Sequence, residues 1–378
     1  MRELFTSITT HQLVVFVVFT SAALVQLFYY LVLYIRVPFW KRREMNQNHE
    51  PISVIICARN EFENLEKHLP SILTQNYPEF EVVVVNHCSE DDTEMLLAEI
   101  KLKYPNLKST FIAPNQKFGQ GKKLALTIGM KAAKYNRLVF TDADCFPVSD
   151  QWLIEMSKSY TGNKQVVLGY GGFLKEKKIV NAFIQFDTLF IAMQYLGFAL
   201  AGRPYMGVGR NLSYFKSLFF SGKGFSGHYS ILSGDDDLFI NENANKANTA
   251  VCLSKESVTR SIPQPNFEQW AKQKMRHLST AGYYKTSDKL LIGFENISRF
   301  LFYVGFVYLL FLNWQPLVVV GIFSFRLLTQ LVIIKLTMNK FNEKGFWLLT
   351  PMFDIILPII HIIFIISNKL NYRKNKWK

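Results

Sequence analysis

Residues 138–147 read L-V-F-T-D-A-D-C-F-P. The apolar run from Leu138 to Phe140 ends in acidic residues, which is the pattern of a buried parallel strand whose carboxyl end opens into a site. Asp142 and Asp144 stand one residue apart and can offer oxygens to a single divalent cation held against substrate phosphates. Two aspartates after a strand also serve as turn and cap residues, so the neighbouring sequence has to decide between these roles.

Strands and helices alternate in the region before this stretch. Apolar, partly β-branched runs predict strands at 52–58, 81–85 and 107–112, and a helix is predicted over 122–135. Such alternation predicts a parallel sheet with ligands at the carboxyl ends of its strands, so three polar loops should converge on one crevice. No G-x-G-x-x-G or Walker motif follows the first strand, which argues against a dinucleotide dehydrogenase or a P-loop NTPase.

Apolar residues are concentrated at both ends of the chain. Leu13 to Ile35 is a run of 23 uncharged residues, followed by basic residues at 36 and 41–43 rather than by a small-residue cleavage site. We therefore expect a retained membrane anchor over residues 1–36. The cationic flank predicts that the chain beyond it lies in the cytoplasm, as part of a multi-pass protein of the cell (inner) membrane.

A second hydrophobic region covers 297–368, and breaks at 313–316 and 338–345 divide it into three segments. Three crossings from the cytoplasm would place the basic tail, residues 369–378, outside, against the positive-inside tendency. We therefore expect either two or three transmembrane segments here.

If one of these segments does not cross the membrane, we expect it to be the last one, as a re-entrant or hairpin element. It contains two prolines together with Asp354 and His361, and polar groups at membrane depth need protein or water around them. Arg326, in the middle segment, also needs protein or water around it at membrane depth.

The net charge of +14 does not by itself indicate nucleic-acid binding. Much of the excess lies in the membrane flanks and the tail, where anionic lipid and orientation explain it. We expect membrane lipids, and no nucleic acid, as partners. The cysteines fall in the region assigned to the cytoplasm with no zinc-like spacing, so we expect free thiols. They are Cys57, Cys88, Cys145 and Cys252.

Six motifs follow one another in the central region: S-V-I-I-C-A-R-N-E, V-V-V-N-H-C-S-E-D-D-T, G-K-K-L-A-L, F-T-D-A-D, S-G-D-D-D-L and Q-K-M-R-H. In this order they resemble the family 2 glycosyltransferases, including the membrane-integrated hyaluronan, chitin and cellulose synthases, over about residues 50–285. The resemblance implies an inverting enzyme with an α/β GT-A fold, a nucleotide-diphosphate sugar as donor and a divalent metal, Mg²⁺ or Mn²⁺. We expect this cytoplasmic domain over 50–290, between the N-terminal transmembrane helix and the C-terminal hydrophobic helical region.

The resemblance places Arg59, Glu61 and Asp91 at the nucleoside of the donor. A carboxylate there can accept hydrogen bonds from base or ribose, although Glu61 and Asp91 can equally cap the helices that follow them. Many family members carry an aspartate pair where this chain has Asn86-His87, which leaves the choice of nucleotide open; a UDP-sugar is the expected donor.

A helix start is predicted at Lys122 and Lys123, directly after Gly119-Gln-Gly121. Backbone N–H groups and ammonium charge can both meet donor phosphate at such a position. A solvated helix start is the alternative. By the resemblance, Asp144 holds the metal with help from Asp142, which also contacts the donor.

The second acidic cluster, Asp235 to Asp237, stands where the family has its general base. Crowded, buried carboxylates raise one another's pKa, which suits a group that takes a proton from an acceptor hydroxyl. Matching the E-D-x-D-L form makes Asp235 the base, whereas matching the G-D-D form makes it Asp236, which we favour; Asp237 is expected on the acceptor side. Upstream, Gly207 and Gly209 would let backbone approach a sugar, or form an ordinary turn.

The motif Q-K-M-R-H resembles the Q-x-x-R-W signature of the membrane-integrated branch. Gln273 and Arg276 share one helix face and can reach the donor diphosphate together. His277 replaces the tryptophan on the acceptor side, which weakens the interpretation as a polymerase. An interfacial helix is expected near 266–286, held at the membrane surface by Trp270, Tyr283 and Tyr284.

The expected function is metal-dependent transfer of a sugar to a lipid-linked or membrane-proximal acceptor, in the synthesis of a cell-envelope glycan or glycolipid. A processive polysaccharide synthase with a glycan acceptor is the alternative within the same enzyme class. A membrane protein that binds a nucleotide sugar without transferring it is the alternative from another class.

Overall fold

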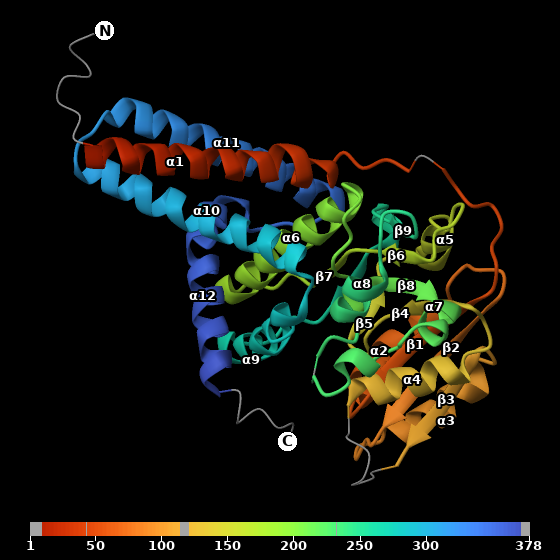
Figure 1. Ribbon diagram of the computed structural model, residues 1–378. Helices are drawn as coiled ribbons and strands as arrows, with labels where there is room; N and C mark the ends of the chain where they lie inside the picture. Colours follow the sequence, from red (N-terminus) through yellow and green to blue (C-terminus); the bar gives the residue numbers. More distant parts are fainter. Residues whose placement is uncertain (1–9, 43, 114–120, 232, 372–378) are drawn as a thin grey trace.

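The computed structural model describes residues 10–42, 44–113, 121–231 and 233–371, with side chains described as far as 368. An α/β domain forms one side of the molecule and a group of long apolar helices forms the other (Figure 1). The first half of the α/β domain contains, in order, β1 (Ile52–Ala58), α2 (Phe62–Leu73), β2 (Phe80–His87), α3 (Thr93–Lys103), β3 (Leu107–Ile112), α4 (Lys122–Ala132) and β4 (Arg137–Phe140). These elements confirm the predicted alternation, with the first and third strands at the expected residues.

The main sheet has the order β3-β2-β1-β4-β8-β6-β9, where β6 is Val166–Leu168, β8 is Leu212–Phe215 and β9 is Thr249–Val251. Strands β3, β2, β1 and β4 are parallel, as predicted. Strand β8 is antiparallel to both β4 and β6, so the sheet is mixed rather than wholly parallel. The prediction failed there because regular strand–helix alternation ends after β4.

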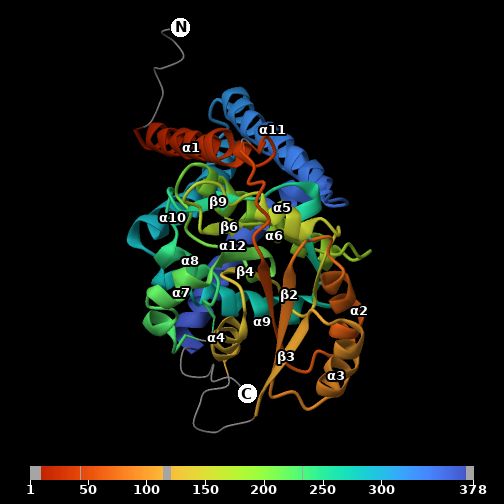
Figure 2. The ribbon, with the colours of Figure 1, turned by 90° about the vertical axis from the view of Figure 1, so that its right-hand side faces the viewer.

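Each face of the parallel half is covered by helices. Side chains of β1 alternate between two cores: Val54 and Ile56 pack with α2 and α3, whereas Ile55 packs with α4. Figure 2 shows α2 and α3 on one side of the strands and α4 on the other. This arrangement leaves the carboxyl edge of the sheet open for the loops that follow β1, β2 and β4.

A second, small sheet lies beyond that edge. Strand β10 (Thr259–Ser261) pairs with both β5 (Cys145–Pro147) and β7 (Gly171–Phe173). The second half of the domain also contains short helices: α5 (Trp152–Ser157), α7 (Lys216–Ser221) and α8 (Asp237–Asn243). Because β5 directly follows the D-A-D motif, the small sheet fixes the far end of that loop.

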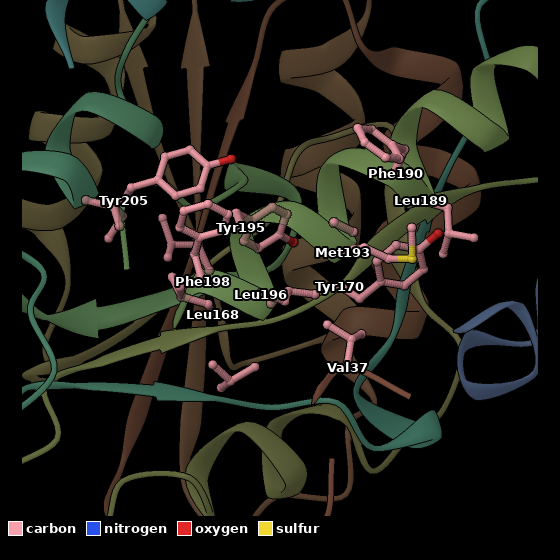
Figure 3. Close-up of a cluster of buried hydrophobic side chains, with 14 of the residues drawn as sticks. Val37, Leu168, Tyr170, Leu189, Phe190, Met193, Tyr195, Leu196, Phe198 and Tyr205 are labelled. Atoms are coloured by element: carbon pink, nitrogen blue, oxygen red, sulfur yellow. The ribbon is translucent and has the colours of Figure 1, made fainter. Parts of the chain in front are cut away.

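Helix α6 (Ile179–Leu200) is an apolar helix inside the domain that the sequence pattern did not predict. It is long and apolar enough to cross a membrane, yet 78% of its most apolar window is buried within the protein. Figure 3 shows Leu196 of α6 beside Leu168 of β6, and Phe190 and Met193 belong to the same buried cluster. The helix also contacts α11 and α12, so it packs between the α/β domain and the other apolar helices.

Three further helices form an elongated bundle: α1 (Thr10–Phe28), α10 (Thr286–Phe311) and α11 (Pro316–Phe341). The Tyr308 hydroxyl lies 3.4 Å from His11 Nε2, so the end of α10 lies beside the start of α1. Lys340 Nζ donates to the Trp40 carbonyl at 3.1 Å, so the end of α11 lies beside the end of the N-terminal helical segment. Thus α10 runs antiparallel to α1, and α11 runs parallel to it.

Helix α12 (Thr350–Asn371) runs across the bundle instead of alongside it (Figure 1). It packs on α6, α10 and α9 (Phe267–Leu278). Its polar residues have protein partners, as expected: Asp354 pairs with Arg326 at 2.8 Å, and His361 Nε2 lies 3.5 Å from Asp187. The four cysteines are unpaired, as predicted.

Candidate active site

A cavity of about 1270 Å³ extends from the carboxyl edge of the sheet to the apolar helices. This volume exceeds the range typical of a pocket for one small ligand, so there is room for a donor and part of an acceptor. It brings together nine of the predicted site residues, which come from four separate parts of the sequence. They are Lys122, Asp142, Asp144, Asp235, Asp236, Asp237, Gln273, Arg276 and His277.

The D-A-D loop after β4 presents both of its carboxylates to this cavity. Asp144 accepts hydrogen bonds from Ser261 Oγ at 2.8 Å and from Cys145 Sγ at 3.3 Å. Burial, and then the neighbouring charge of Asp142, raise the pKa of Asp144 above its usual value. A cation placed here would offset the repulsion between two carboxylates that lie close together.

Oxygens of Asp142 and Asp144 and the Cys145 sulfur all lie within 4.8 Å of one another. Burial raises the pKa of the Cys145 thiol well above its usual value, so this thiol is a poor ligand. Two carboxylate oxygens remain, which is the hard donor set that Mg²⁺ or Mn²⁺ uses alongside substrate phosphate. The residues therefore fit a divalent cation held jointly by protein and donor.

Lys122, the first residue of α4, joins the two acidic clusters. Its ammonium group lies 2.6 Å from Asp142 Oδ1 and 3.3 Å from Asp235 Oδ2. The carboxylates of Asp142 and Asp235 are the main charges that raise the Lys122 pKa, against the opposing effect of burial. Lys122 is thus a fixed positive charge at the centre of the site.

The second lysine of this pair has a different role from the one predicted. Lys123 is buried and donates to the carbonyls of His228 and Ile231, the latter at 2.8 Å. Lys123 also lines the cavity, but these bonds use its ammonium group to hold α4 to the 228–231 segment. Residues 119 and 120 of the predicted phosphate loop lie outside the described residues.

Asp236 is the N-cap of α8, and backbone groups fix both of its oxygens. Oδ2 accepts from the Gly209 N–H and Oδ1 from the Asp237 N–H, each at 2.7 Å. Gly209 thus holds the predicted base through its N–H group. Burial, followed by the charges of Asp235 and Asp237, raises the pKa of Asp236 from 3.8 to about 7. A carboxyl group with this pKa is suited to take up a proton near neutral pH.

Asp237 faces the loop that leads into α10. Its Oδ2 accepts from Tyr284 OH at 2.7 Å and from Thr280 Oγ1, while Oδ1 accepts from the Leu238 N–H at 2.8 Å. These bonds tie the loop between α9 and α10 to the acidic cluster. They indicate a positioning role for Asp237.

The three predicted nucleoside residues are absent from the described lining of the cavity. Asp91 Oδ2 accepts from the Phe62 N–H at 3.1 Å and Oδ1 from the Thr93 N–H at 3.2 Å, so Asp91 caps the start of α2 and shapes its own turn. Glu61 is the residue before α2, and Asn64 donates to it at 2.6 Å. Burial raises the pKa of Glu61, and the charges of Asp144, Asp142 and Asp91 add to this effect. Arg59 lies on the same loop, and donor contacts of Arg59, Glu61 and Asp91 stay predictions.

Residues 86 and 87 belong to strand β2 and not to a loop as predicted. Asn86 and His87 are both buried. The loop starts at Cys88, whose φ of 55° places it in the left-handed region. The Asn86-His87 pair, which stands where many family members have two aspartates, therefore lies at the carboxyl end of strand β2.

Comparison with known proteins supports the resemblance. The model of glycosyl transferase family 2 matches residues 53–218. These residues form a family 2 glycosyltransferase domain. They hold the D-A-D loop and both strands beside it.

Curated relatives share parts of this glycosyltransferase domain. Glycosyltransferase AglE from Haloferax volcanii is 36% identical over 104 residues, 27% of this chain and 33% of that protein. Poly-beta-1,6-N-acetyl-D-glucosamine synthase from Staphylococcus aureus strain COL is 28% identical over 149 residues, 37% of this chain and 35% of that protein. The chain thus spans about a third of the length of these relatives.

The fold also has a solved counterpart. The structure of the mannosyltransferase PcManGT from Pyrobaculum calidifontis, in complex with GDP-Man and Mn2+, superposes with a TM-score of 0.57 at 16% identity, covering 87% of this chain and 98% of that one. At this identity the similarity shows the GT-A fold alone.

The Q-K-M-R-H motif, which lies beyond the residues matched by the family model, is on α9 and lines the cavity. Gln273 and Arg276 line the cavity, and the positive charge of Arg276 contributes to lowering the Asp142 pKa. His277 also lines the cavity. This placement agrees with the predicted site.

The predicted membrane contacts of Trp270 and Tyr284 are wrong. Trp270 is buried between Phe183, Phe267 and Phe364, and Tyr284 is buried against Asp237. The sequence cannot reveal this, because α6 and α12 cover a helix face that looks interfacial. Of the three aromatic residues, only Tyr283 is exposed, at 53%.

Sequence reasoning missed several polar residues of the glycosyltransferase cavity. Arg210 lines it and stacks over Phe173 at 4.3 Å. Its charge adds to the lowering of the Asp142 pKa by Lys122 and opposes the rise of the Asp144 pKa that burial and Asp142 cause. Asp187, Lys274 and His361 also line it and contact one another. The signal for Arg210 was its place directly after Gly209. Nothing in the sequence links the other three.

Proposed function

We propose that the protein transfers a sugar, with inversion, from a nucleotide-diphosphate sugar to a lipid-linked acceptor at the cytoplasmic face of the cell membrane. The observation that supports this most strongly is the continuity of the cavity. One space holds both acidic clusters and Arg276, and it continues between apolar helices that meet the criteria for membrane spans. A hydrophilic donor and an amphiphilic acceptor can therefore meet at Asp236.

In this proposal Asp142 and Asp144 hold a divalent cation, which offsets the charge of the departing diphosphate. Lys122, Arg210 and Arg276 supply further positive charge around the same space. Asp236 takes the proton of the acceptor hydroxyl. The acceptor oxygen bonds to the anomeric carbon, the bond from that carbon to the phosphate oxygen breaks, and its electron pair leaves with the nucleoside diphosphate.

We further propose that α1, α10 and α11 cross the membrane while α12 lies at its cytoplasmic surface. The relative directions of the three helices place Arg36, Lys285 and Lys340 at the end of the bundle that faces the α/β domain. The tail then stays in the cytoplasm, which agrees with the positive-inside tendency and resolves the conflict that three C-terminal crossings would create.

A processive synthase is the second candidate, because several curated relatives are named as polymer synthases. The shape of the cavity favours single transfer. Within the described residues, its lining includes α6, α9, α10 and α12 but no residue of α1 or α11, so it passes beside the bundle instead of through it. A polymer channel would need another subunit or partner to complete it.

The proposal is tested by incubating the purified protein with a panel of nucleotide sugars and a membrane lipid extract. Release of nucleoside diphosphate that depends on the extract, with one sugar added per lipid in mass spectra, is the expected result. Long product ladders would refute single transfer. Binding of a donor without any release of nucleoside diphosphate would refute the proposal that the protein is an enzyme.

A further inference from the structure

We infer that the acceptor is an amphiphile with a hydroxyl-rich, uncharged head, and that it enters sideways through a groove between α10 and α12. This inference rests on the proposed function and specifies its acceptor. The groove is the end of the cavity farthest from the D-A-D loop. Its walls are one stripe of α10 and one stripe of α12.

The α10 stripe consists of residues spaced three or four apart, which places them on one helix face. It includes Ile292, Gly293, Ile297 and Phe300. The side chains of Ile297 and Phe300 are 58% and 49% exposed. The groove is therefore open beside these apolar side chains, and the same helix face also carries Lys289 and Asn296.

The α12 stripe faces it with Pro358, Ile362 and Ile365. Ile362 and Ile365 are 44% and 39% exposed, so both walls end in accessible aliphatic side chains. Both walls also belong to helices that meet the criteria for membrane spans. Lipid chains are the apolar material that such a surface meets, and an apolar chain in the groove would cover these side chains.

Polar side chains from three helices form a neck between the groove and the acidic clusters. Asp187 of α6 accepts from Lys274 Nζ of α9 at 2.8 and 2.7 Å, and His361 of α12 lies 3.5 Å from Asp187. We call Asp187, Lys274 and His361 the neck cluster. It lies where the head of an amphiphile would sit if its chain occupied the groove and a hydroxyl reached Asp236.

The chemistry of the neck cluster indicates the kind of head. Asp187 and Lys274 cancel each other's charge, while the cluster still presents both donors and acceptors of hydrogen bonds. Thr188, Gln194 and Asn296 add uncharged polar groups to the same lining. Such a set suits the hydroxyls of a sugar or polyol, whereas a phosphate head would meet the Asp187 carboxylate.

Gly293 keeps the groove wide enough for a chain. A Cβ built at Gly293 would meet no atom within 4 Å, so a larger side chain would project into open space and not into the protein. Gly321 on α11 is a matched position, since a Cβ there also meets nothing and the residue does not line the cavity. Phenylalanine at either position should preserve the fold, but only Gly293→Phe fills the groove.

The test uses an alkyl glucoside that carries a photoreactive diazirine in its chain, with the full-length protein in detergent. Cross-links should map to the α10 and α12 stripes. Gly293→Phe should lower them by at least about tenfold, a loss of about 1.4 kcal/mol in binding, whereas Gly321→Phe should leave them unchanged. Labelling that is scattered over the bundle, or unaffected by Gly293→Phe, would overturn the groove.

Further experiments distinguish a failure of the proposed groove from a failure of the uncharged head or of the proposed function. The same chain on a phosphate head should label the stripes more weakly; equal or stronger labelling would overturn the uncharged head. His361→Gln should weaken competition by unlabelled alkyl glucoside. Donor hydrolysis by water is measured in parallel with wild-type protein: its absence would contradict the proposed function, whereas specific cross-links would still support the groove.

Discussion

Two groups of buried charges in this molecule contrast with each other, one in the bundle of apolar helices and one in the cavity. In the bundle, Arg326 contacts Asp354, Gln330 and Gln26 at 2.6 to 2.8 Å, and Arg299 contacts Glu295 and Asp354. Two positive and two negative side chains balance there, and all are sealed from solvent. This bundle network joins α1, α10, α11 and α12.

In the cavity, by contrast, like charges are crowded together. Asp235, Asp236 and Asp237 are consecutive, and Asp142 and Asp144 are separated by one residue. Charges that are fully paired resist titration and hold helices in place, whereas crowded carboxylates favour taking up a proton or a cation. The difference predicts which buried charges serve structure and which serve chemistry.

The largest expected effect comes from removing a crowded carboxylate. Asp236→Asn should lower sugar transfer by about 10²- to 10⁴-fold, the usual contribution of a general base. Asp144→Asn, or chelation of divalent metal, should have a comparable effect. Transfer to the lipid extract is measured, with Asp92→Asn, an exposed aspartate of the second loop, as the control. Near-normal transfer in both site variants would contradict the assignment.

Breaking the bundle network should affect stability instead of chemistry. Arg326→Leu leaves Asp354 with an incomplete set of partners and should destabilise the fold by about 3–5 kcal/mol. Arg326→Leu combined with Asp354→Leu removes one charge of each sign and should recover most of that loss. Thermal unfolding in detergent measures both. If the single variant were as stable as wild type, the network would not hold the bundle together.

The crowded cluster should also make transfer depend on pH. Because Asp236 must be ionised to accept a proton and its pKa is raised to about 7, the rate should fall as pH drops below about 7 and level off above it. Asp235→Asn removes a neighbouring negative charge and should move this inflection to lower pH. Complete loss of transfer in Asp235→Asn, with Asp236→Asn still active, would instead identify Asp235 as the base.

The smallest effect on transfer is expected where the loop between α9 and α10 contacts the acidic cluster of the cavity. Tyr284→Phe removes one of the three hydrogen bonds to Asp237, which should cost about 1 kcal/mol and lower transfer only several-fold. Thr280→Val tests the second bond in the same way. The ratio of transfer to donor hydrolysis is the measurement, because a shifted α9–α10 loop should impair acceptor placement more than donor binding. Equal loss of both activities would contradict this coupling.

Local pattern in the sequence was enough to predict much of this protein. Apolar strands followed by polar loops predicted β1 to β4 and placed Asp142 and Asp144 at the carboxyl edge of the sheet, because parallel strands place their carboxyl ends at one edge. The second acidic cluster was assigned to the site by the order of the motifs that resemble the family. Uninterrupted apolar runs predicted α1, α10 and α11, and the rule that buried charges need partners predicted that Arg326 and Asp354 would find them.

Tertiary structure alone decided the features that depend on contacts between distant segments. Trp270 looks interfacial in sequence, yet α6 and α12 bury it; Lys123 looks like a phosphate ligand, yet it binds carbonyls more than a hundred residues away. Periodicity reports which face of an element is apolar but not what covers that face. The sequence therefore determined the two candidate carboxylate clusters by local order, whereas the neck cluster exists only because three helices far apart in the chain pack against one another.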